Sequence, residues 1–338
     1  MMVYNGLFLR NGSGKLMVII FSLLVVVLVI RQLNAAECFA FSGPLSESLE
    51  IINRCSPHSP GTPNHSNGVT DMGLPNIIHQ IWRTNDVRTY STELKASQDL
   101  WKTMFNPVNY TVKLWTDDDV LQLLEAKYNW LLSTYKGYPQ NIQRADLARL
   151  VVVHAEGGMY ADLDVYPRDA TQIQCLQHLG LQAIFAPTAG TLGLSNHFFM
   201  AERESSFLQW ALCEAKRRGG AESRRILLPY LQVFWTTGPI MVTAAFREYA
   251  WLYSTQRQNL GLLHERYGQA VIQHAAGRSW HGSDGKVLNY MVDHTPMTVL
   301  LSLFILIILF GLVCVVRKRC YKYRRLFAYR RLNAIRLD

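Results

Sequence analysis

The sequence predicts one α/β domain with a mostly parallel central sheet, placed between two long apolar segments. Apolar runs typical of buried strands alternate along the chain with segments whose apolar residues recur at helical spacing. This alternation is typical of a parallel sheet covered by helices. The 338 residues, 49% of them hydrophobic, are enough for one sizeable core. We therefore expect one folded domain with membrane segments attached to it.

The first expected elements follow one another from residue 74. A short apolar run with a proline at its start, Leu74–Trp82, predicts a buried strand. The segment Leu94–Phe105 has apolar residues at helical spacing, and Tyr110–Thr116 alternates as a second strand. The segment Asp117–Tyr128 begins with three acidic residues, which stabilise the positive end of a helix.

A longer helix and a strand complete the central part of the prediction. Residues 142–158, with the sequence IQRADLARLVVVHAEGG, predict a helix that ends at the paired glycines. The next eight residues, Met159–Tyr166, are expected to be extended. Further along, Thr236–Pro239 predicts the start of another helix with a proline in its first turn.

The net charge of +9 is concentrated at the two ends of the chain. Residues 317–338 hold nine Lys or Arg and one Asp, and residues 1–31 hold three basic residues and no acidic one. The part between them is therefore slightly acidic. A nucleic-acid-binding domain would carry its basic charge on the folded part, so the sequence argues against nucleic acid as a partner.

Two hydrophobic runs lie inside these basic ends. Leu16–Ile30 has 15 residues and Met297–Val316 has 20, against roughly 20 needed to span a bilayer. The second run is followed at once by basic residues that mark a cytosolic flank, so it predicts a transmembrane helix. The first run predicts a membrane anchor or a signal peptide cleaved after Ala36. We favour the anchor, because Asn34 at the −3 position suits cleavage poorly.

Both termini are then expected to be cytosolic, and the domain to face the lumen. A segment rich in Pro, Ser, Asn and Gly precedes the domain and predicts a stem. Two glycosylation sequons, at Asn64 and Asn109, fit a lumenal placement. The predicted parts are a cytosolic N-terminus (1–15), the anchor or signal peptide (16–30), the stem (31–73), the lumenal domain (74–290), the transmembrane helix (297–316) and the basic cytosolic tail (317–338).

Four of the six cysteines, Cys38, Cys55, Cys175 and Cys213, fall in the predicted lumenal part. An even number of cysteines in an oxidising compartment indicates disulfides. Their pairing cannot be read from the sequence, and proximity alone suggests Cys38 with Cys55.

The expected strand Met159–Tyr166 carries two aspartates two residues apart. In an extended chain Asp162 and Asp164 project to the same face, where two carboxylates repel each other unless they share a cation. Oxygen ligands of this kind suit Mg²⁺ or Mn²⁺, and an ion held by few protein ligands keeps open positions for a diphosphate. Hydrated acids on an exposed edge strand are the alternative. We favour the metal, because the pair ends an apparently central strand, where α/β folds place ligands.

Three segments resemble a known family: IIHQIW, IQRADLARLVVVHAEGGMYADLDV and PYLQVFWTTGP. They are similar to the D-x-D sugar transferases that include the fungal initiating α-mannosyltransferases and, more closely, the inositol phosphoceramide mannosyltransferases. The resemblance covers about residues 74–284. It implies a GT-A fold, transfer with retention of the anomeric configuration, a nucleotide-sugar donor, usually GDP-mannose, and a divalent metal, commonly Mn²⁺. It also implies a Golgi membrane location and a lipid acceptor such as inositol phosphoceramide in the bilayer. A regulatory subunit would be a further possible partner.

The resemblance also implies roles for individual residues. Asp162 and Asp164 would bind the metal and the diphosphate. Asp146 and Arg149, three residues apart and so on one face of the expected helix, would hold the donor hexose, and a local ion pair is the alternative. Arg144 would reach a phosphate.

Further residues would complete the site. His79, Gln80 and Trp82 would lie near the nucleotide, although core packing explains Trp82 equally well. Asn196 would approach the reacting sugar from the acceptor side, with an ordinary turn before a strand as the alternative. His281 is our candidate for the third metal ligand, with a structural histidine as the alternative.

Three classes of function stay open. A metal-dependent glycosyltransferase at a membrane surface is favoured. A catalytically silent relative that binds a sugar nucleotide would usually lack the acidic pair, which is present here. A metal-dependent hydrolase would need further His and Asp clusters that the chain lacks. The sequence does not decide between a lipid and a glycan acceptor, nor between mannose and another hexose.

Overall fold

The computed structural model describes residues 23–24, 26–28, 30–32, 49–56, 74–86, 89–188, 193–220, 222–253, 259–275, 282–294 and 296. Within these ranges no helix is both long and apolar enough to cross a membrane. The predicted transmembrane helix 297–316, the tail 317–338 and most of the predicted anchor 16–30 lie outside the described residues. The chain divides into two compact units. One consists of residues 1–31 and 282–338 and contains helix α11 (Ser283–Asp293); the other, Gln32–His281, holds all the strands.

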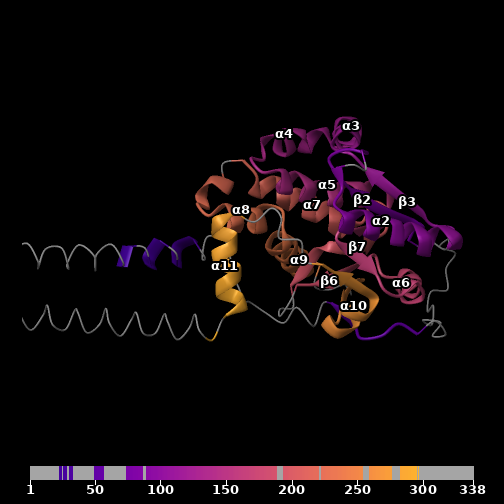
Figure 1. The fold of residues 1–338 in the computed structure, drawn as a ribbon. Coiled ribbons are helices and arrows are strands. Elements are labelled where there is room, and N and C mark those ends of the chain that lie inside the picture. The colour runs from indigo at the N-terminus through magenta and orange to yellow at the C-terminus, as the bar shows by residue number, and fades with distance from the viewer. Residues whose placement is uncertain are drawn as a thin grey trace, which may run out of the picture. The chain divides into compact units, whose positions relative to one another are not determined.

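The larger unit is built on a seven-stranded sheet (Figure 1). Its strands are β1 (Glu50–Ile52), β2 (Ile77–Ile81), β3 (Thr111–Trp115), β4 (Gly158–Ala161), β6 (Ala183–Pro187), β7 (Leu194–Ala201) and β8 (Leu260–Leu263). They lie in the order β1-β8-β6-β7-β4-β2-β3. Only β7 runs antiparallel to its described neighbours, β4 and β6. The predicted α/β class with a mostly parallel central sheet is therefore confirmed.

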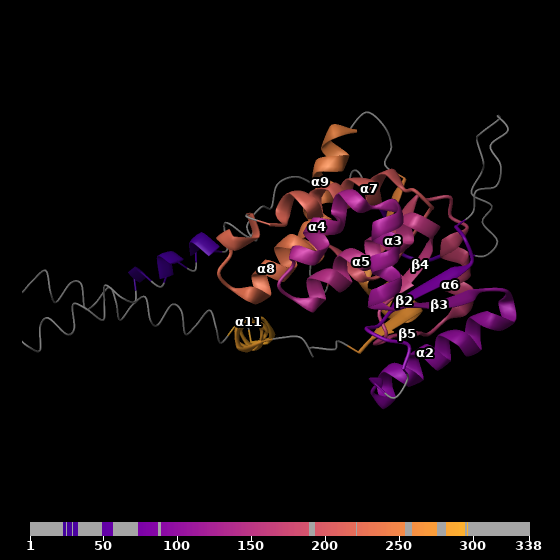
Figure 2. The same ribbon diagram turned by 90° about the horizontal axis from the view of Figure 1, so that it is seen from above.

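Helices cover both faces of this sheet (Figures 1 and 2). The helices of this unit are α2 (Thr92–Phe105), α3 (Asp117–Lys127), α4 (Asn129–Gly137), α5 (Asn141–Glu156), α6 (Ala170–Gln177), α7 (Ser206–Arg218), α8 (Pro229–Thr236), α9 (Pro239–Leu252) and α10 (Glu265–Val271), with 3₁₀ turns η3 (Asn106–Val108) and η4 (Glu222–Arg225). One core layer packs α3, α4, α5, α7 and α9 on the sheet, and a second packs α2, α6 and α10 on its other face. Successive residues of β4 alternate between the layers, with Tyr160 in the first and Met159 and Ala161 in the second. The helix predicted to start in the segment Thr236–Pro239 is α9, whose first residue is Pro239.

The link between α5 and β4 depends on two glycines. Gly157 and Gly158 have φ values of 69° and 100°, in the left-handed region that favours glycine. A Cβ atom at Gly157 would lie 2.8 Å from the backbone nitrogen of Arg203, and one at Gly158 would lie 2.5 Å from the carbonyl oxygen of Ile77. The predicted stop of the helix at these glycines is confirmed, and it allows β4 to begin directly after α5.

The prediction of one uninterrupted strand over residues 159–166 is wrong. Strand β4 ends at Ala161; the backbone N–H of Asp162 makes one more bond to β7, to the carbonyl of His197 at 2.9 Å, and the chain then turns. The N–H of Val165 returns to the carbonyl of Asp162, also at 2.9 Å. The chain then enters a small antiparallel sheet formed by β5 (Val165–Pro167) and β9 (Ile272–His274). The two motif aspartates therefore lie in a turn at the end of a central strand.

Part of the predicted stem belongs to the folded domain. Strand β1 pairs in parallel with β8 at one edge of the sheet, so the domain includes residues well before position 74. Cys55, just after β1, forms a disulfide with Cys175 of α6, with the two Cα atoms 5.9 Å apart. The expected pairing of Cys38 with Cys55 is therefore wrong, because the fold brings together two cysteines separated by 120 residues. At its other end this unit stops at His281, short of the expected residue 290.

Candidate functional site

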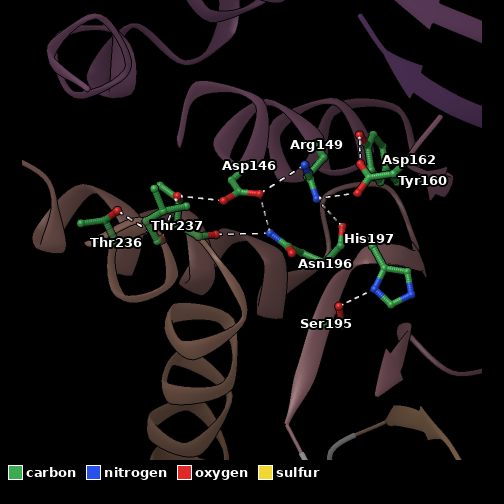
Figure 3. A network of polar contacts seen from close by, with 10 residues as sticks. Asp146, Arg149, Tyr160, Asp162, Ser195, Asn196, His197, Thr236 and Thr237 are labelled. Carbon is green, nitrogen blue, oxygen red and sulfur yellow. Dashed lines mark hydrogen bonds and ion pairs between the residues drawn. The ribbon is translucent and has the colours of Figure 1, made fainter. Parts of the chain in front are cut away.

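Polar side chains converge where β4 ends, beside α5 and β7 (Figure 3). Helix α5 contributes Asp146 and Arg149, whose predicted position on one helix face is confirmed by an ion pair 3.2 Å long. Strand β4 contributes Tyr160, the turn after it Asp162, and strand β7 Asn196. Three separate elements thus bring opposite charges together at the carboxyl end of a central strand.

Asp146 is held by three partners inside the protein. Its Oδ1 atom accepts a hydrogen bond from Asn196 Nδ2 at 3.0 Å and lies 3.2 Å from Arg149 Nη2. Its Oδ2 atom accepts from Thr237 Oγ1 at 3.1 Å. Burial raises the pKa of Asp146 to about 6, although the charge of Arg149 acts in the opposite direction. The carboxylate is therefore fixed in place while its ionised form is costly.

Arg149 joins the two carboxylates. Its Nη1 atom lies 3.2 Å from Asp162 Oδ2 and donates to the carbonyl of Asn196 at 3.1 Å. The guanidinium also lies over the ring of Tyr160, 5.1 Å from the centroid. Burial disfavours its charge, but Asp162, Tyr160 and Asp146 outweigh burial and raise the pKa of Arg149. One planar cation with a fixed fork of donors thus orients two acids.

The two motif aspartates, Asp162 and Asp164, are more exposed to solvent than Asp146 and Arg149. The side chains of Asp162 and Asp164 are 23% and 21% exposed. Asp162 Oδ1 accepts a hydrogen bond from the Tyr160 hydroxyl at 2.6 Å, and burial raises the pKa of Asp162 against the effect of Arg149. Asp164 Oδ2 lies 3.5 Å from His274 Nε2. Asp162 therefore connects the buried network to the partly exposed turn.

A pair of histidines lies beside Asp164. The rings of His197 and His274 stack with their centroids 4.3 Å apart and their planes 8° apart. Burial, together with His274, lowers the pKa of His197 to about 3, and its Nδ1 atom lies 2.5 Å from Ser195 Oγ. For His274 burial is outweighed by Asp164 and Asp162, which raise its pKa. The neutral ring of His197 therefore stacks on His274, which is more easily protonated and lies next to Asp164.

The donor atoms of the turn fit an open metal site. No group of three His, Cys, Asp or Glu side chains in the described part of the chain forms a closed one. Carboxylate and imidazole ligands suit ions such as Mn²⁺, and two ligands at about 2.1 Å from one ion lie about 3 Å apart in adjacent octahedral positions. The distance of 3.5 Å between Asp164 Oδ2 and His274 Nε2 is close to that value. The predicted third ligand, His281, lies outside the described residues.

The three residues predicted near the nucleotide differ in their surroundings. His79 has no exposed surface; its Nδ1 atom accepts from Trp115 Nε1 at 3.0 Å and its Nε2 atom lies 2.8 Å from the carbonyl of Gly157. Burial lowers the pKa of His79 to about 4, so the ring is neutral. Gln80 is also fully buried, and neither of its amide atoms has a hydrogen-bond partner among the described residues. Trp82 is half-buried, with Nε1 donating to Thr89 at 2.9 Å.

Two further predicted residues have partners that the sequence did not indicate. Arg144 turns back toward the start of α5, where it donates to the carbonyl of Tyr138 at 2.7 Å and to the side chain of Asn141. Asn196 is 4% exposed and holds Asp146 through its amide and Arg149 through its backbone carbonyl. In this structure Asn196 is therefore a part of the buried network.

The sequence analysis assigned no role in the site to four residues of this region, Tyr160, His197, Thr237 and His274. The alternation of β4 was a usable signal for Tyr160, because it placed this residue on the face of Asp162. Thr237 stands beside a helix start, a position that ordinary helix initiation explains without a ligand. The two histidines come together from β7 and β9, which no local pattern reveals.

Comparisons with known proteins point to one kind of chemistry. Residues 91–182 match a family model described as a glycosyltransferase sugar-binding region containing a DXD motif. Inositol phosphoceramide mannosyltransferase 1 of Schizosaccharomyces pombe is 27% identical over 69% of this chain and 70% of its own length. Inositol phosphoceramide mannosyltransferase 3 of the same yeast is 28% identical over 65% of this chain. The mannosyl phosphorylinositol ceramide synthase SUR1 of Saccharomyces cerevisiae is 26% identical over 65%. The match spans only 60% and 55% of the last two relatives.

Among solved structures, the PaToxG glycosyltransferase aligns over 63% of this chain and 82% of its own, with 16% identity and a TM-score of 0.34. A likeness this low carries no argument about activity. The family match is different, because residues 91–182 contain both the Asp146–Arg149 pair and the turn with Asp162 and Asp164. Over residues 91–182 the chain is therefore similar to the sugar-binding region, with its DXD motif, of a glycosyltransferase family, and over about two thirds of its length it is similar to inositol phosphoceramide mannosyltransferases.

Proposed function

We propose that this glycosyltransferase moves mannose from GDP-mannose to a membrane glycolipid of the inositol phosphoceramide type, with retention of the anomeric configuration. Three relatives that share about two thirds of this chain carry names that specify this acceptor class. The sheet, with one antiparallel strand among parallel ones, is consistent with a GT-A fold.

The observation that carries the proposal is the charge network that ends at the DXD turn. Sugar transfer breaks the bond between the sugar and a diphosphate, and negative charge develops on the departing oxygen. Preorganised charges in a site of low dielectric stabilise such charge without further reorganisation. Arg149, fixed between Asp146 and Asp162, has the required burial and fixed orientation.

The residues in and around the turn would have separate roles in binding the metal and the donor. Asp162 and Asp164 would hold a divalent ion, with His274 beside them, and the bound ion would neutralise charge on the diphosphate. Asp146, whose two oxygens are held by Arg149, Asn196 and Thr237, would keep Arg149 in position beside the donor hexose. The stacked ring of His197 would keep His274 in position at the edge of this site.

The first test uses the purified full-length protein and a panel of nucleotide sugars with Mn²⁺. We expect hydrolysis of GDP-mannose above that of the other donors, and its loss on chelation with EDTA. The Asp162→Asn, Asp164→Asn double variant should be inactive, whereas Asp118→Asn, a change of an exposed acid on α3, should keep full activity. Hydrolysis that is equal in the double variant and the wild type would contradict the proposed site.

The acceptor is tested by competition. The same protein, in vesicles, receives inositol phosphoceramide in the membrane and a soluble mannan oligosaccharide in the buffer. Transfer to the lipid is expected. A preference for the soluble glycan would replace the lipid proposal by that of a hexosyltransferase acting on glycans.

We further propose that the domain lies in the Golgi lumen, with both termini cytosolic and a regulatory subunit as a further partner. The Cys55–Cys175 disulfide supports an oxidising compartment. Protease added to sealed Golgi vesicles should leave the domain intact and shorten only the termini. Digestion of the domain without detergent would refute this topology.

A further inference from the structure

A buried glutamine ties the chain that follows the first apolar run to one loop of the domain. Gln32 is 5% exposed. Its Nε2 atom donates to the carbonyl of Arg225 at 3.3 Å, and its Oε1 atom accepts from the N–H of Leu227 at 2.6 Å. Arg225 is the last residue of η4, and Leu227 lies in the segment that joins η4 to α8. Two main-chain hydrogen bonds to a buried amide fix the position of this segment relative to Gln32.

The position of Gln32 in the sequence makes this contact informative. It stands two residues after Ile30, the last residue of the apolar run 16–30. Two residues of extended chain span at most about 7 Å, so chain connectivity alone keeps Ile30 within that distance of Gln32. Cleavage after Ala36 would remove Gln32 and leave the two main-chain groups of the loop without this partner. The contact therefore favours an anchor that stays attached over a cleaved signal peptide.

The chemistry of the loop suits a membrane surface. Arg224 is exposed, and the side chain of Leu227 is 62% exposed. On the adjoining α8, the rings of Tyr230 and Phe234 are half-buried and lie 4.6 Å apart. Single exposed apolar residues are common on protein surfaces. Here a cation, an apolar side chain and two aromatic rings occur within eleven residues, a combination enriched where proteins meet lipid headgroups.

A short helix connects this loop to the charge network. Helix α8 has eight residues and is therefore about 12 Å long. Its last residue, Thr236, accepts a hydrogen bond from Gln143 Nε2 of α5 at 2.8 Å. The next residue, Thr237, donates to Asp146. The network that would hold the donor hexose thus lies one short helix from the loop fixed by Gln32.

We propose that the segment from Arg224 to Tyr230 rests on the bilayer that holds the first apolar run, with Arg224 against the phosphate of inositol phosphoceramide-type headgroups in the lumenal leaflet and Leu227 in the interface. This inference rests on the proposed function, because it explains how a donor site reaches an acceptor that stays in the membrane. The occupant of the surface is the lipid headgroup layer, and the segment keeps the donor site near it.

The first experiment measures contact with lipid and does not depend on activity. Photoreactive benzoylphenylalanine is placed at position 227 or, as a control, at position 179. Leu179 is 38% exposed and follows α6, which lies at the end of the domain opposite α8 in both ribbon views (Figures 1 and 2). The full-length protein is irradiated in vesicles of phosphatidylcholine and phosphatidylinositol. We expect several-fold more lipid adduct at position 227, and equal yields at the two positions would overturn the proposal.

The second experiment measures the consequence for transfer. Arg224→Glu should lower transfer to inositol phosphoceramide in vesicles about fivefold or more, since one basic residue near an acidic membrane changes the local lipid occupancy by about that factor. Donor hydrolysis in detergent should not change. Arg266→Glu, an exposed arginine on α10, is the matched control and should leave both activities unchanged.

The outcomes separate the two proposals. If wild-type protein transfers to lipid and Arg224→Glu transfers equally well, the surface assignment is wrong and the proposed function stands. If wild-type protein neither hydrolyses GDP-mannose nor transfers to lipid, the proposed function is wrong, and the adduct yields at positions 227 and 179 still decide the surface assignment.

Discussion

The two ends of the charge network differ in their contact with solvent. The side chains of Asp146 and Arg149, at the inner end, are each 6% exposed, while those of Asp162 and Asp164, at the outer end, are 23% and 21% exposed. At the inner end protein groups occupy both oxygens of Asp146. The difference suggests that the inner end is part of the framework of the fold, whereas the outer end is available to ligands.

The largest expected effect comes from removing the cation that both ends share. Arg149→Met leaves Asp146 and Asp162 without their common partner, so it should destabilise the protein by about 3–5 kcal/mol and abolish transfer. Urea unfolding followed by circular dichroism measures the first effect. Arg149→Lys keeps the positive charge without the planar fork of donors. Its stability and its transfer activity should therefore lie between those of the wild type and of Arg149→Met. An unchanged unfolding midpoint in Arg149→Met would show that the inner end is not structural.

The next effect separates the two motif aspartates. Asp164→Asn should lower kcat/KM at least about 100-fold, the scale seen when one preorganised electrostatic group is lost, while leaving the unfolding midpoint almost unchanged. Asp162→Asn should lower kcat/KM similarly and also reduce stability by about 1–3 kcal/mol, because it breaks contacts with Arg149 and Tyr160. Equal losses of stability in the two variants would contradict the view that Asp162 belongs to the buried network while Asp164 does not.

The pH dependence should reveal Asp146. Its pKa is raised from 3.8 to about 6 by burial, so in the folded protein it becomes protonated as the pH falls through about 6. Activity should decline over that range, because a protonated Asp146 no longer accepts from all three partners. The contribution to stability has the opposite sign: a raised pKa favours folding at low pH, and this benefit is lost as the pH rises through about 6. In Asp146→Asn both pH-dependent changes should disappear, and a pH profile like that of the wild type would exclude Asp146 as their source.

The smallest effect on catalysis is expected at His79. His79→Phe leaves the indole N–H of Trp115 and the carbonyl of Gly157 without partners, which should cost about 1–3 kcal/mol of stability. The KM for the donor should change little, since His79 has no exposed surface. A large rise in the donor KM with unchanged stability would instead support the nucleotide contact that the sequence resemblance implied.

The features that sequence predicted well are those specified by neighbouring residues. Helix α5 follows from its local spacing and from the glycines that end it, and a three-residue interval brings Asp146 and Arg149 together. The sequence DLD, by contrast, fits an extended strand as well as it fits a turn. After the turn, residues 165–167 pair with β9, more than 100 residues further along the chain, so the end of β4 depends on a contact that the local sequence does not show.

The remaining contacts of the site join distant parts of the chain. Asn196 and Thr237 reach Asp146 across 50 and 91 residues. No periodicity records such distances, because they are set by how helices and strands pack in three dimensions. For the same reason the resemblance could suggest that Asn196 belongs to the site but could not show that its amide is enclosed with Asp146.

The pairing of β1 with β8 has a consequence for biosynthesis. Glu50 opposes Gly261, so this edge of the sheet cannot close until about 200 further residues have been made. At about 5–20 residues per second, that interval lasts roughly 10–40 s. During this interval Cys55 emerges long before Cys175, and Cys38 is the nearest cysteine available to it. Correct maturation should therefore depend on thiol–disulfide exchange after translation, and depletion of a disulfide isomerase should trap molecules linked through Cys38.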